Sequence, residues 1–309
     1  MIIKALIVDE KRKQMISIKC SNCGAEMSVD TKGNLYCPYC QSTAHFSDDE
    51  LKEYREYRMN MLQYLRASAD ENATKADSRF LNYCDSIYFN SVDDQTFAID
   101  YQFFYEEDNV KTYITQSSVV FVFEKKDIDK VSKFKEGIEL LQYPSADMKG
   151  LSSCFPSIKM EAELEDGRYL LAVSKEENAY PLFAFGSIAP VHVAWIVSRL
   201  ENMACVFEYS QLVHGGMSMN TVFINTRTHQ AFLLGGWWKA RKKFNIMDKK
   251  DLYDIRKVAN QVMGELKGEA PKEFINFVKG APATEAYSDF SLWDTVIEKG
   301  FGGHKFVKF

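Results

Sequence analysis

The pattern of apolar and polar positions predicts strands in the middle of the chain. Five segments there either alternate apolar with polar residues or run apolar over a short stretch, which is typical of strands. They are residues 96–105, 110–115, 118–123, 158–164 and 169–173. Between the third and the fourth, residues 127–142 place apolar side chains three and four positions apart, which predicts a helix.

From Pro190 onward the pattern is mainly helical. Residues 191–207 are rich in apolar side chains on every side, as in a helix that is buried within a domain. Two short apolar strands flank the polar turn 225–230. The last stretch, 293–309, is rich in phenylalanine and glycine, and we expect it to dock on this domain, with docking on another chain as the alternative.

Helix signals precede the strand-rich region. Ser47 and Glu50 have the spacing of a capping box, and the apolar residues after them predict a helix to about Ala69. Residues 69–77 lack an apolar period and are interpreted as a linker or a bend. A second helical piece is expected at 78–88.

Composition and charge exclude several classes of protein. With 309 residues, the chain is expected to hold about two domains. Its 46% hydrophobic and 26% charged residues exclude disorder, collagen and coiled coil as descriptions of the whole. A net charge of −5 argues against a dedicated nucleic-acid binder. The sequence has neither an apolar run long enough for a membrane helix nor a signal peptide, so a cytoplasmic protein with reduced thiols is expected.

Four of the seven cysteines form two Cys-x-x-Cys pairs near the N-terminus. The pairs are Cys20 with Cys23 and Cys37 with Cys40. Residues 26–29 and 34–36 are expected to form a hairpin between them, around the turn at Lys32 and Gly33. Four thiolates presented in this way are the ligand set of a structural zinc site, and the pattern resembles a zinc ribbon. The alternative is two disulfides or four free thiols. The remaining cysteines, which share no metal spacing, are Cys84, Cys154 and Cys205.

The order of the predicted elements resembles that of a protein kinase. Residues 213–224 are similar to the catalytic loop of that family, and 232–237 stand in the place of the strand that leads to its D-F-G motif. Asp251 opens a segment similar to the start of the family's central buried helix, and residues 271–278 match a later helix. The resemblance covers roughly residues 95–285 and implies a β-rich lobe followed by a larger α-rich lobe.

The positions that would carry kinase chemistry are changed. By this resemblance the catalytic base falls at Gly216, a metal-binding asparagine at Thr221, and the Mg²⁺-binding aspartate at Gly235. Asn220 would supply the asparagine only after a shift of one position. Glycine has no carboxylate that could accept a proton or bind a metal ion. The resemblance therefore implies a pseudokinase without catalytic or nucleotide-binding residues, in which His214 has a structural role.

The β-rich part also lacks the expected phosphate-binding features. Bulky residues 101–105 stand where a kinase has its glycine-rich loop. Phe123 occupies the place of the phosphate-pairing lysine, although Lys125 and Lys126 follow just beyond the strand. Without a lysine partner, the acidic residues of the following helix are interpreted as surface charges. They are Glu136 and Glu139.

Two tryptophans and four bases stand where a kinase has its activation segment. The residues are Trp237, Trp238, Lys239, Arg241, Lys242 and Lys243. This segment is interpreted as an anchor for an acidic protein partner or as a nucleic-acid phosphate site with aromatic stacking. The third interpretation is that a tryptophan fills the core or the empty nucleotide cleft while the bases are solvated.

Together these features predict an α+β protein with a zinc ribbon at 1–46, a helical linker at 47–92 and a bilobal kinase-like domain at 93–309. The expected function is that of a non-catalytic zinc-ribbon pseudokinase, which acts as a protein-interaction or scaffolding module with a protein partner and without a membrane. One alternative is a nucleic-acid-associated factor that uses the ribbon and segment 237–243. Another is an atypical nucleotide-binding enzyme.

Overall fold

The computed structural model describes most of the chain from Cys84 onward and short pieces before it. Described are residues 28–29, 34–36, 43–45, 80, 84–143, 149–226, 228–245, 247–304, 307 and 309. Contacts divide the chain into two units, residues 1–103 with 163–166 and residues 104–162 with 167–309. Within the described ranges, no helix combines the length and the apolar character that crossing a bilayer requires.

The first unit contains a small antiparallel sheet of three short strands between residues 28 and 45. Strand β1 (Ser28–Val29) pairs with β2 (Asn34–Tyr36), with Ser28 opposite Tyr36, and β2 pairs in turn with β3 (Thr43–His45). The hairpin expected between the two Cys-x-x-Cys pairs is confirmed, whereas β3 is not predicted by the sequence pattern. The predicted metal ligands lie outside the described residues, as does the helix expected at 47–69. These ligands are Cys20, Cys23, Cys37 and Cys40.

A second hairpin of the first unit corrects the prediction for residues 78–88. Strand β4 (Asp85–Asn90) pairs antiparallel with β5 (Thr96–Tyr101), so the helix expected at 78–88 is wrong from Asp85 onward. Phe89 and Ile99, both buried, lie on these two strands. Aromatic and β-branched side chains favour such half-buried strands, and the cross-strand partners that stabilise them are not adjacent in the sequence.

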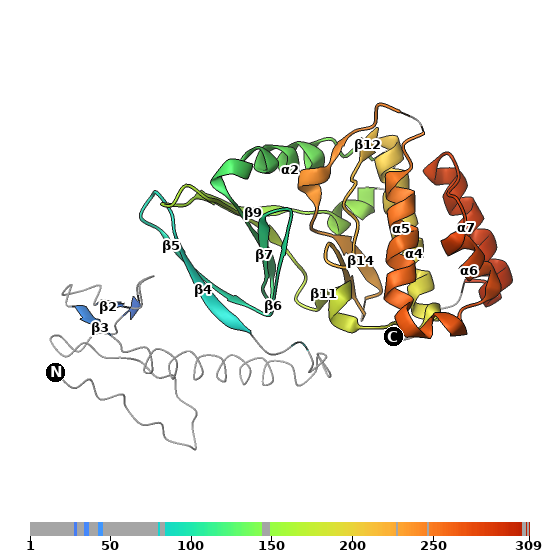
Figure 1. The fold of residues 1–309 in the computed structure, drawn as a ribbon, viewed down its shortest axis with the longest axis horizontal. Helices are drawn as coiled ribbons and strands as arrows, with labels where there is room; N and C mark the ends of the chain where they lie inside the picture. The colour runs from blue at the N-terminus through green and yellow to red at the C-terminus, as the bar shows by residue number, and fades with distance from the viewer. Residues whose placement is uncertain are drawn as a thin grey trace, which may run out of the picture. The chain divides into compact units, whose positions relative to one another are not determined.

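A five-stranded sheet forms the β-rich part of the second unit (Figure 1). Its strands, in spatial order, are β6 (Phe103–Glu107), β7 (Val110–Ile114), β8 (Ser118–Phe123), β10 (Tyr169–Ser174) and β9 (Ile158–Glu163). Both β7 and β10 pair antiparallel with the central strand β8, every residue of which is buried. The strands predicted at 110–115, 118–123, 158–164 and 169–173 are confirmed.

The single strand predicted at 96–105 is two strands, β5 and β6, which are separated at Gln102. The Gln102 side chain is buried, and its Nε2 donates a hydrogen bond to the carbonyl oxygen of Phe80 at 2.6 Å. At the other end of β6, Asp108 and Asn109 have φ angles of 53° and 59°. Two successive residues in the left-handed backbone conformation form a tight turn whose twist matches that of the two strands. Strand β6 therefore leads directly into β7 as a hairpin.

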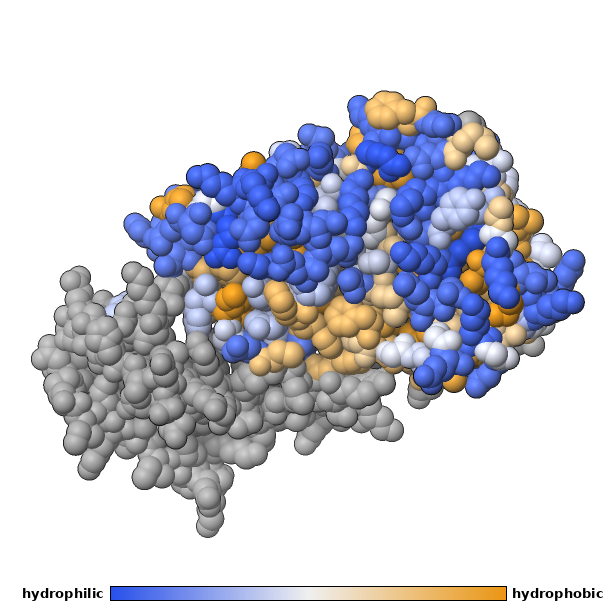
Figure 2. Space-filling view, viewed as in Figure 1, coloured by the Kyte–Doolittle hydropathy of each residue, from blue (hydrophilic) through white to orange (hydrophobic). Residues whose placement is uncertain are grey.

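The helix predicted at 127–142 is α2 (Asp129–Glu139). Its apolar side packs on the sheet, where the Phe134 and Phe121 ring centroids are 5.3 Å apart. Gly137 allows a close approach, because a Cβ atom at this position would lie 2.7 Å from the Cβ atom of Ala240. Glu136 is exposed on the outer side, and Figure 2 shows mainly hydrophilic surface over this helix.

Four helices make up most of the rest of the second unit and lie on the side away from β6 and β7 (Figure 1). They are α4 (Pro190–Tyr209), α5 (Lys250–Met263), α6 (Lys272–Lys279) and α7 (Ala286–Phe301). The remaining strands form two small sheets. One has three strands, β11 (Ala179–Pro181), β13 (Val222–Asn225) and β14 (Gln230–Leu233), and the other pairs β12 (Leu212–Val213) with β15 (Arg241–Lys242). Short 3-10 helices are η2 (Lys125–Asp127), η3 (Gly150–Cys154), η4 (Leu182–Phe185), η5 (Trp237–Lys239) and η6 (Gly264–Glu269). The second unit therefore has a mixed α+β fold with a β-rich part and a helical part.

A buried ion pair links α5 to α7. Arg256 donates to both carboxylate oxygens of Asp289, at 2.7 and 2.8 Å, and Asp289 also accepts the N–H of Ala283 at 2.7 Å. Glu201 of α4 is buried nearby, and burial together with the Asp289 carboxylate raises the pKa of Glu201 to about 9. Glu201 is therefore neutral at pH 7, which leaves Asp289 and Arg256 as a balanced pair of buried charges.

The aromatic end of the chain docks on the second unit. The ring of Phe309 lies 4.7 Å from that of His192 and 5.8 Å from that of Phe185, measured between centroids. Docking on the same domain, expected for 293–309, is confirmed for this residue. Trp293, however, belongs to α7, which the glycine- and phenylalanine-rich composition of the segment does not predict.

Candidate functional site

The loop between β12 and β13 is closed by hydrogen bonds from His214. This side chain is fully buried, and burial lowers its pKa to about 3, so the ring is neutral. Its Nδ1 accepts the N–H of Gly216 and its Nε2 donates to the carbonyl oxygen of Gly235, both at 3.1 Å. The tautomer follows from these partners. Both ring nitrogens are thus engaged by the backbone and hold the loop against the segment after β14.

Thr221, which stands in the place of a metal-binding asparagine, joins the two ends of this loop. Its Oγ1 donates to the carbonyl oxygen of Gly216 and accepts the N–H of Ser218, both at 2.8 Å. Its backbone oxygen accepts the N–H of Leu234 at 3.1 Å. The side chain is fully buried. A hydroxyl that is engaged in this way maintains the loop conformation and does not face an open cleft.

Asp251, in the first turn of α5, holds the loop from the helical side. Its two carboxylate oxygens accept the N–H groups of His214 and Gly215, at 2.9 and 2.7 Å. Burial raises the pKa of Asp251 to about 6, while the two backbone hydrogen bonds act in the opposite direction. Two charge-assisted hydrogen bonds therefore fix the start of the loop to α5.

A side chain at either glycine of the expected catalytic positions would be crowded by its neighbours. At Gly216, a Cβ atom would lie 3.0 Å from the carbonyl oxygen of Gly236 and 3.1 Å from Cδ of Lys239. At Gly235, a Cβ atom would lie 3.1 Å from Cγ2 of Thr221 and 3.3 Å from the hydroxyl of Tyr105. A Cβ atom at either position would therefore require its neighbours to shift by a few tenths of an ångström.

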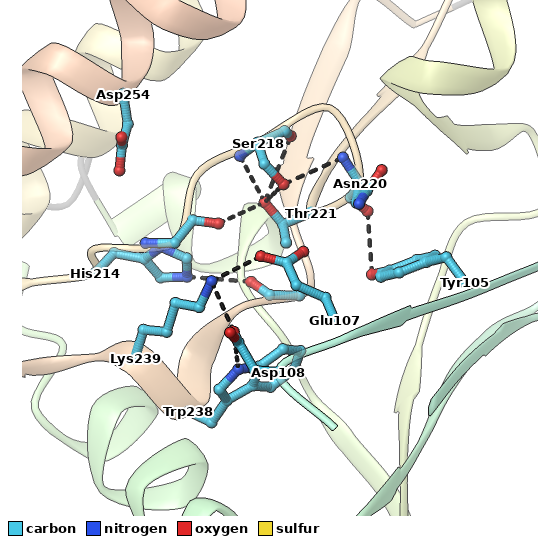
Figure 3. A network of polar contacts seen from close by, with 12 residues as sticks. Tyr105, Glu107, Asp108, His214, Ser218, Asn220, Thr221, Trp238, Lys239 and Asp254 are labelled. Atoms are coloured by element: carbon cyan, nitrogen blue, oxygen red, sulfur yellow. Dashed lines mark hydrogen bonds and ion pairs between the residues drawn. The ribbon is translucent and has the colours of Figure 1, made fainter. Parts of the chain in front are cut away.

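Lys239 and Tyr105 connect the β6–β7 hairpin to the loop region, as Figure 3 shows. The ammonium group of Lys239 lies 2.7 Å from Glu107 Oε1 and 2.8 Å from Asp108 Oδ2. Although burial opposes its charged form, hydrogen bonds to Asp108 and Glu107 raise the pKa of Lys239. Tyr105 donates from its hydroxyl to the carbonyl oxygen of Asn220 at 3.2 Å. The β6–β7 hairpin is thus held close to both glycine positions.

Both tryptophans of the 237–243 segment are buried, Trp237 at 0% exposure and Trp238 at 4%. Trp237 donates from Nε1 to the carbonyl oxygen of Leu233 at 2.9 Å. Trp238 packs edge-on against two phenylalanine rings of β8, Phe121 at 5.7 Å and Phe123 at 6.0 Å between centroids. The structure therefore agrees with the interpretation in which the tryptophans fill the interior of the protein. A partner protein has no access to either ring.

The bases of the same segment are mostly paired. Arg241 forms an ion pair with Asp248 at 2.5 Å, and Lys243, nearly buried, forms one with Glu208 at 2.7 Å. Lys242 is exposed and forms no ion pair with the residues that the structure describes. Because acidic groups of the same unit already neutralise most of these charges, the segment is not a strongly basic surface.

The lysines beyond β8 do not replace the missing phosphate-pairing lysine. Lys125 and Lys126 lie in η2 and are exposed. The Lys125 side chain lies beside Gly167, in the turn between β9 and β10. Its Cδ is 3.0 Å from the position that a Cβ atom would have at Gly167. Glu136 and Glu139 are exposed on α2. The buried Cys205 is no candidate nucleophile, since burial raises the pKa of its thiol to about 12.

Sequence reasoning missed the acidic partners of Lys239 and the contact of Tyr105 with the loop. In the sequence, Glu107 and Asp108 are polar residues between the segments 96–105 and 110–115, and Lys239 is one of four bases in 237–243. The Lys239 to Glu107 pair spans 132 positions and the Tyr105 to Asn220 pair spans 115. No local spacing encodes contacts at such separations.

Comparison with protein-family models and with curated proteins gives no match for this chain. Among solved structures it is similar to vaccinia related kinase 3, at 10% identity over 69% of this chain and 91% of that one, with a TM-score of 0.47. A rhoptry kinase from Toxoplasma gondii is 10% identical over 78% of this chain and 94% of that one, with a TM-score of 0.45. The bifunctional kinase-methyltransferase WbdD is 14% identical over 68% of this chain and 48% of that one, with a TM-score of 0.44.

Proposed function

We propose that this protein is a kinase-like protein without phosphoryl-transfer activity, which serves as a protein-interaction or scaffolding module. The observation that carries this proposal is the crowding at Gly216 and Gly235. The resemblance of residues 213–224 and 232–237 to kinase motifs places the base and the Mg²⁺ ligand there. The backbone of Gly236 and the side chains of Thr221 and Tyr105 stand within 3.3 Å of where those side chains would begin.

The physical requirements of phosphoryl transfer support this proposal. The reaction depends on metal ions that neutralise the phosphates and on a carboxylate that orients the attacking hydroxyl, with little covalent chemistry from the protein. In this chain Lys239, whose side chain lies beside Gly216, is already paired with Glu107 and Asp108. Phe123, in the place of the phosphate-pairing lysine, packs on Trp238. Lys239 and Phe123 thus contact other side chains of the same unit.

An inactive kinase-like fold retains a use as a rigid body that presents surfaces to other proteins. The contacts from Lys239 and Tyr105 hold the hairpin against the loop, and Asp251 holds the loop on α5. The basic segment 237–243 is largely neutralised by Glu208 and Asp248, so no described contact favours the nucleic-acid alternative. A protein partner is therefore the preferred proposal.

Nucleotide binding and phosphoryl transfer test this proposal on the purified full-length chain. We expect that ATP with Mg²⁺ leaves the melting temperature unchanged, and that incubation with radiolabelled ATP labels neither the chain nor a generic substrate such as myelin basic protein. Mg²⁺-dependent autophosphorylation that Lys239→Met abolishes would refute the proposal. A protein kinase of known activity, assayed in parallel, is the positive control.

We also propose that Cys20, Cys23, Cys37 and Cys40 hold a structural zinc ion. The β1–β2 hairpin lies between the two pairs in the sequence, which is the arrangement that a zinc ribbon requires. Metal analysis of the purified chain is expected to give about one equivalent of zinc, as a closed tetrahedral site binds. Cys37→Ser should lose the zinc, whereas Cys84→Ser, a change at an exposed cysteine elsewhere, should retain it. Equal zinc content in the two variants would contradict the assignment.

A further inference from the structure

A cavity of about 220 Å³ lies in the helical part, apart from the loop at 214–221. Helices α4 and α7 form its main walls, and His229, Gly303, His304 and Val307 complete it. Much of the lining is apolar. The apolar side chains are Val191, Ala194, Ile297, Phe301 and Val307. Cavities of about 150 Å³ already hold a benzene ring, so this one has room for a ring with a short substituent.

One wall of the cavity is a stacked pair of aromatic rings, Trp195 and His229. Their planes are inclined by only 6°, with centroids 5.1 Å apart. The indole Nε1–H of Trp195 is buried and has no hydrogen-bond partner among the described residues. A buried donor without an acceptor costs free energy, and an acceptor supplied by a ligand would recover it. The residues of this wall therefore include one buried donor that no described residue satisfies.

Arg199 supplies a positive charge at the same wall. Its Nε donates to the backbone oxygen of His229 at 3.3 Å, which orients the guanidinium group through one edge. Its terminal nitrogens form no ion pair with the described residues, and the side chain is exposed. Ser198, by contrast, is already satisfied, since its hydroxyl accepts from Trp293 Nε1 at 2.8 Å and donates to the Ala194 oxygen. Trp195 Nε1 and the terminal nitrogens of Arg199 are thus two donor groups of this wall, and Arg199 is charged.

We propose that this cavity binds a small organic carboxylate with a ring-sized apolar body. The carboxylate would pair with Arg199 and accept the Trp195 N–H, and the body would lie between the Trp195–His229 wall and the α7 residues Ile297 and Phe301. A planar guanidinium group matches a carboxylate with two parallel hydrogen bonds. A bare inorganic anion would leave the apolar walls uncovered, and a neutral ligand would not engage the charge.

Calorimetric titration of the full chain with phenylacetate tests the proposal, with the neutral amide phenylacetamide as the matched ligand. We expect saturable binding of phenylacetate, quenching of Trp195 fluorescence, and at least a tenfold weaker affinity for phenylacetamide. Quenching should disappear in Trp195→Phe, which leaves the other three tryptophans in place. Absence of saturable binding, or equal affinity for the two ligands, would overturn the proposal and indicate that the cavity holds only water.

Arg199→Met separates the charged contact from simple burial of a ring. Because Arg199 is exposed, this variant is expected to fold, which circular dichroism and the melting temperature verify. We expect it to lower the affinity for phenylacetate at least tenfold and to leave that for phenylacetamide unchanged. Arg241→Met, which removes another exposed arginine that does not line the cavity, is the control and should bind both ligands as the wild type does. A tenfold loss in both variants, or in neither, would contradict the proposed role of Arg199.

Discussion

Gly235→Asp is expected to destabilise the protein strongly and to create no kinase activity. The new Cβ would lie 3.1 Å from Thr221 Cγ2 and 3.3 Å from the Tyr105 hydroxyl, so the site is overpacked before the carboxylate is placed. Overpacking alone costs about 1–3 kcal/mol, and a buried carboxylate without a partner brings the expected loss to about 3–5 kcal/mol. Urea denaturation followed by circular dichroism measures the loss, and a radiolabelled ATP assay measures activity.

Gly268→Asp is the matched control for this change. It introduces the same side chain at a glycine with no atom within 4 Å of the Cβ position, so the free energy of unfolding should change by no more than about 0.5 kcal/mol. Equal stability of the two variants would show that the space beside Gly235 opens readily. Mg²⁺-dependent ATP binding by Gly235→Asp would show that the cleft accepts a nucleotide once its metal ligand is restored. Either result would contradict the role given to Tyr105 and Thr221.

The secondary structure of the second unit was largely predictable because each element carries its own pattern. Residues 118–123 form a continuous apolar run and become the buried central strand β8, and 127–142 have helical spacing and become α2. The first unit was less predictable at 78–88. The strand β4 found there is specified by its pairing with β5, and a cross-strand partner leaves no mark in the spacing of either segment alone.

In the candidate site, too, some residues could be predicted from the sequence and others could not. The motif comparison located His214, Thr221 and Asp251, whose contacts lie within or next to the segments that resemble a kinase. It left Trp237 and Trp238 ambiguous, because a tryptophan pair in a basic segment is compatible with both a core and a binding surface. Only the packing of Trp238 on β8, more than a hundred positions earlier, distinguishes the two.

Asp251→Ala is expected to detach the 214–221 loop from α5. The change leaves the buried N–H of His214 and the half-buried N–H of Gly215 without their acceptors, at about 1–3 kcal/mol for a fully buried group and less for a half-buried one. We expect a loss of about 2–4 kcal/mol at pH 7, since the burial that raises the pKa of Asp251 already weakens its contribution. Urea denaturation measures this loss, and faster amide hydrogen exchange at 214–216 would locate it in the loop.

The pH dependence of the same variant provides a second test. Asp251 has a pKa of about 6 in the folded protein, above its usual 3.8, so the folded state retains a proton that the unfolded chain releases between these values. As the pH rises through this range, the free energy of unfolding of the wild type falls relative to that of Asp251→Ala. The stability difference between the two proteins therefore becomes smaller. Asp129→Ala, which removes an exposed aspartate from the first turn of α2, is the control and should alter neither stability nor loop exchange appreciably. If Asp251→Ala behaved like this control, the loop would not depend on α5, and the rigid kinase-like body that the proposed function requires would have to be held by Lys239 and Tyr105 alone.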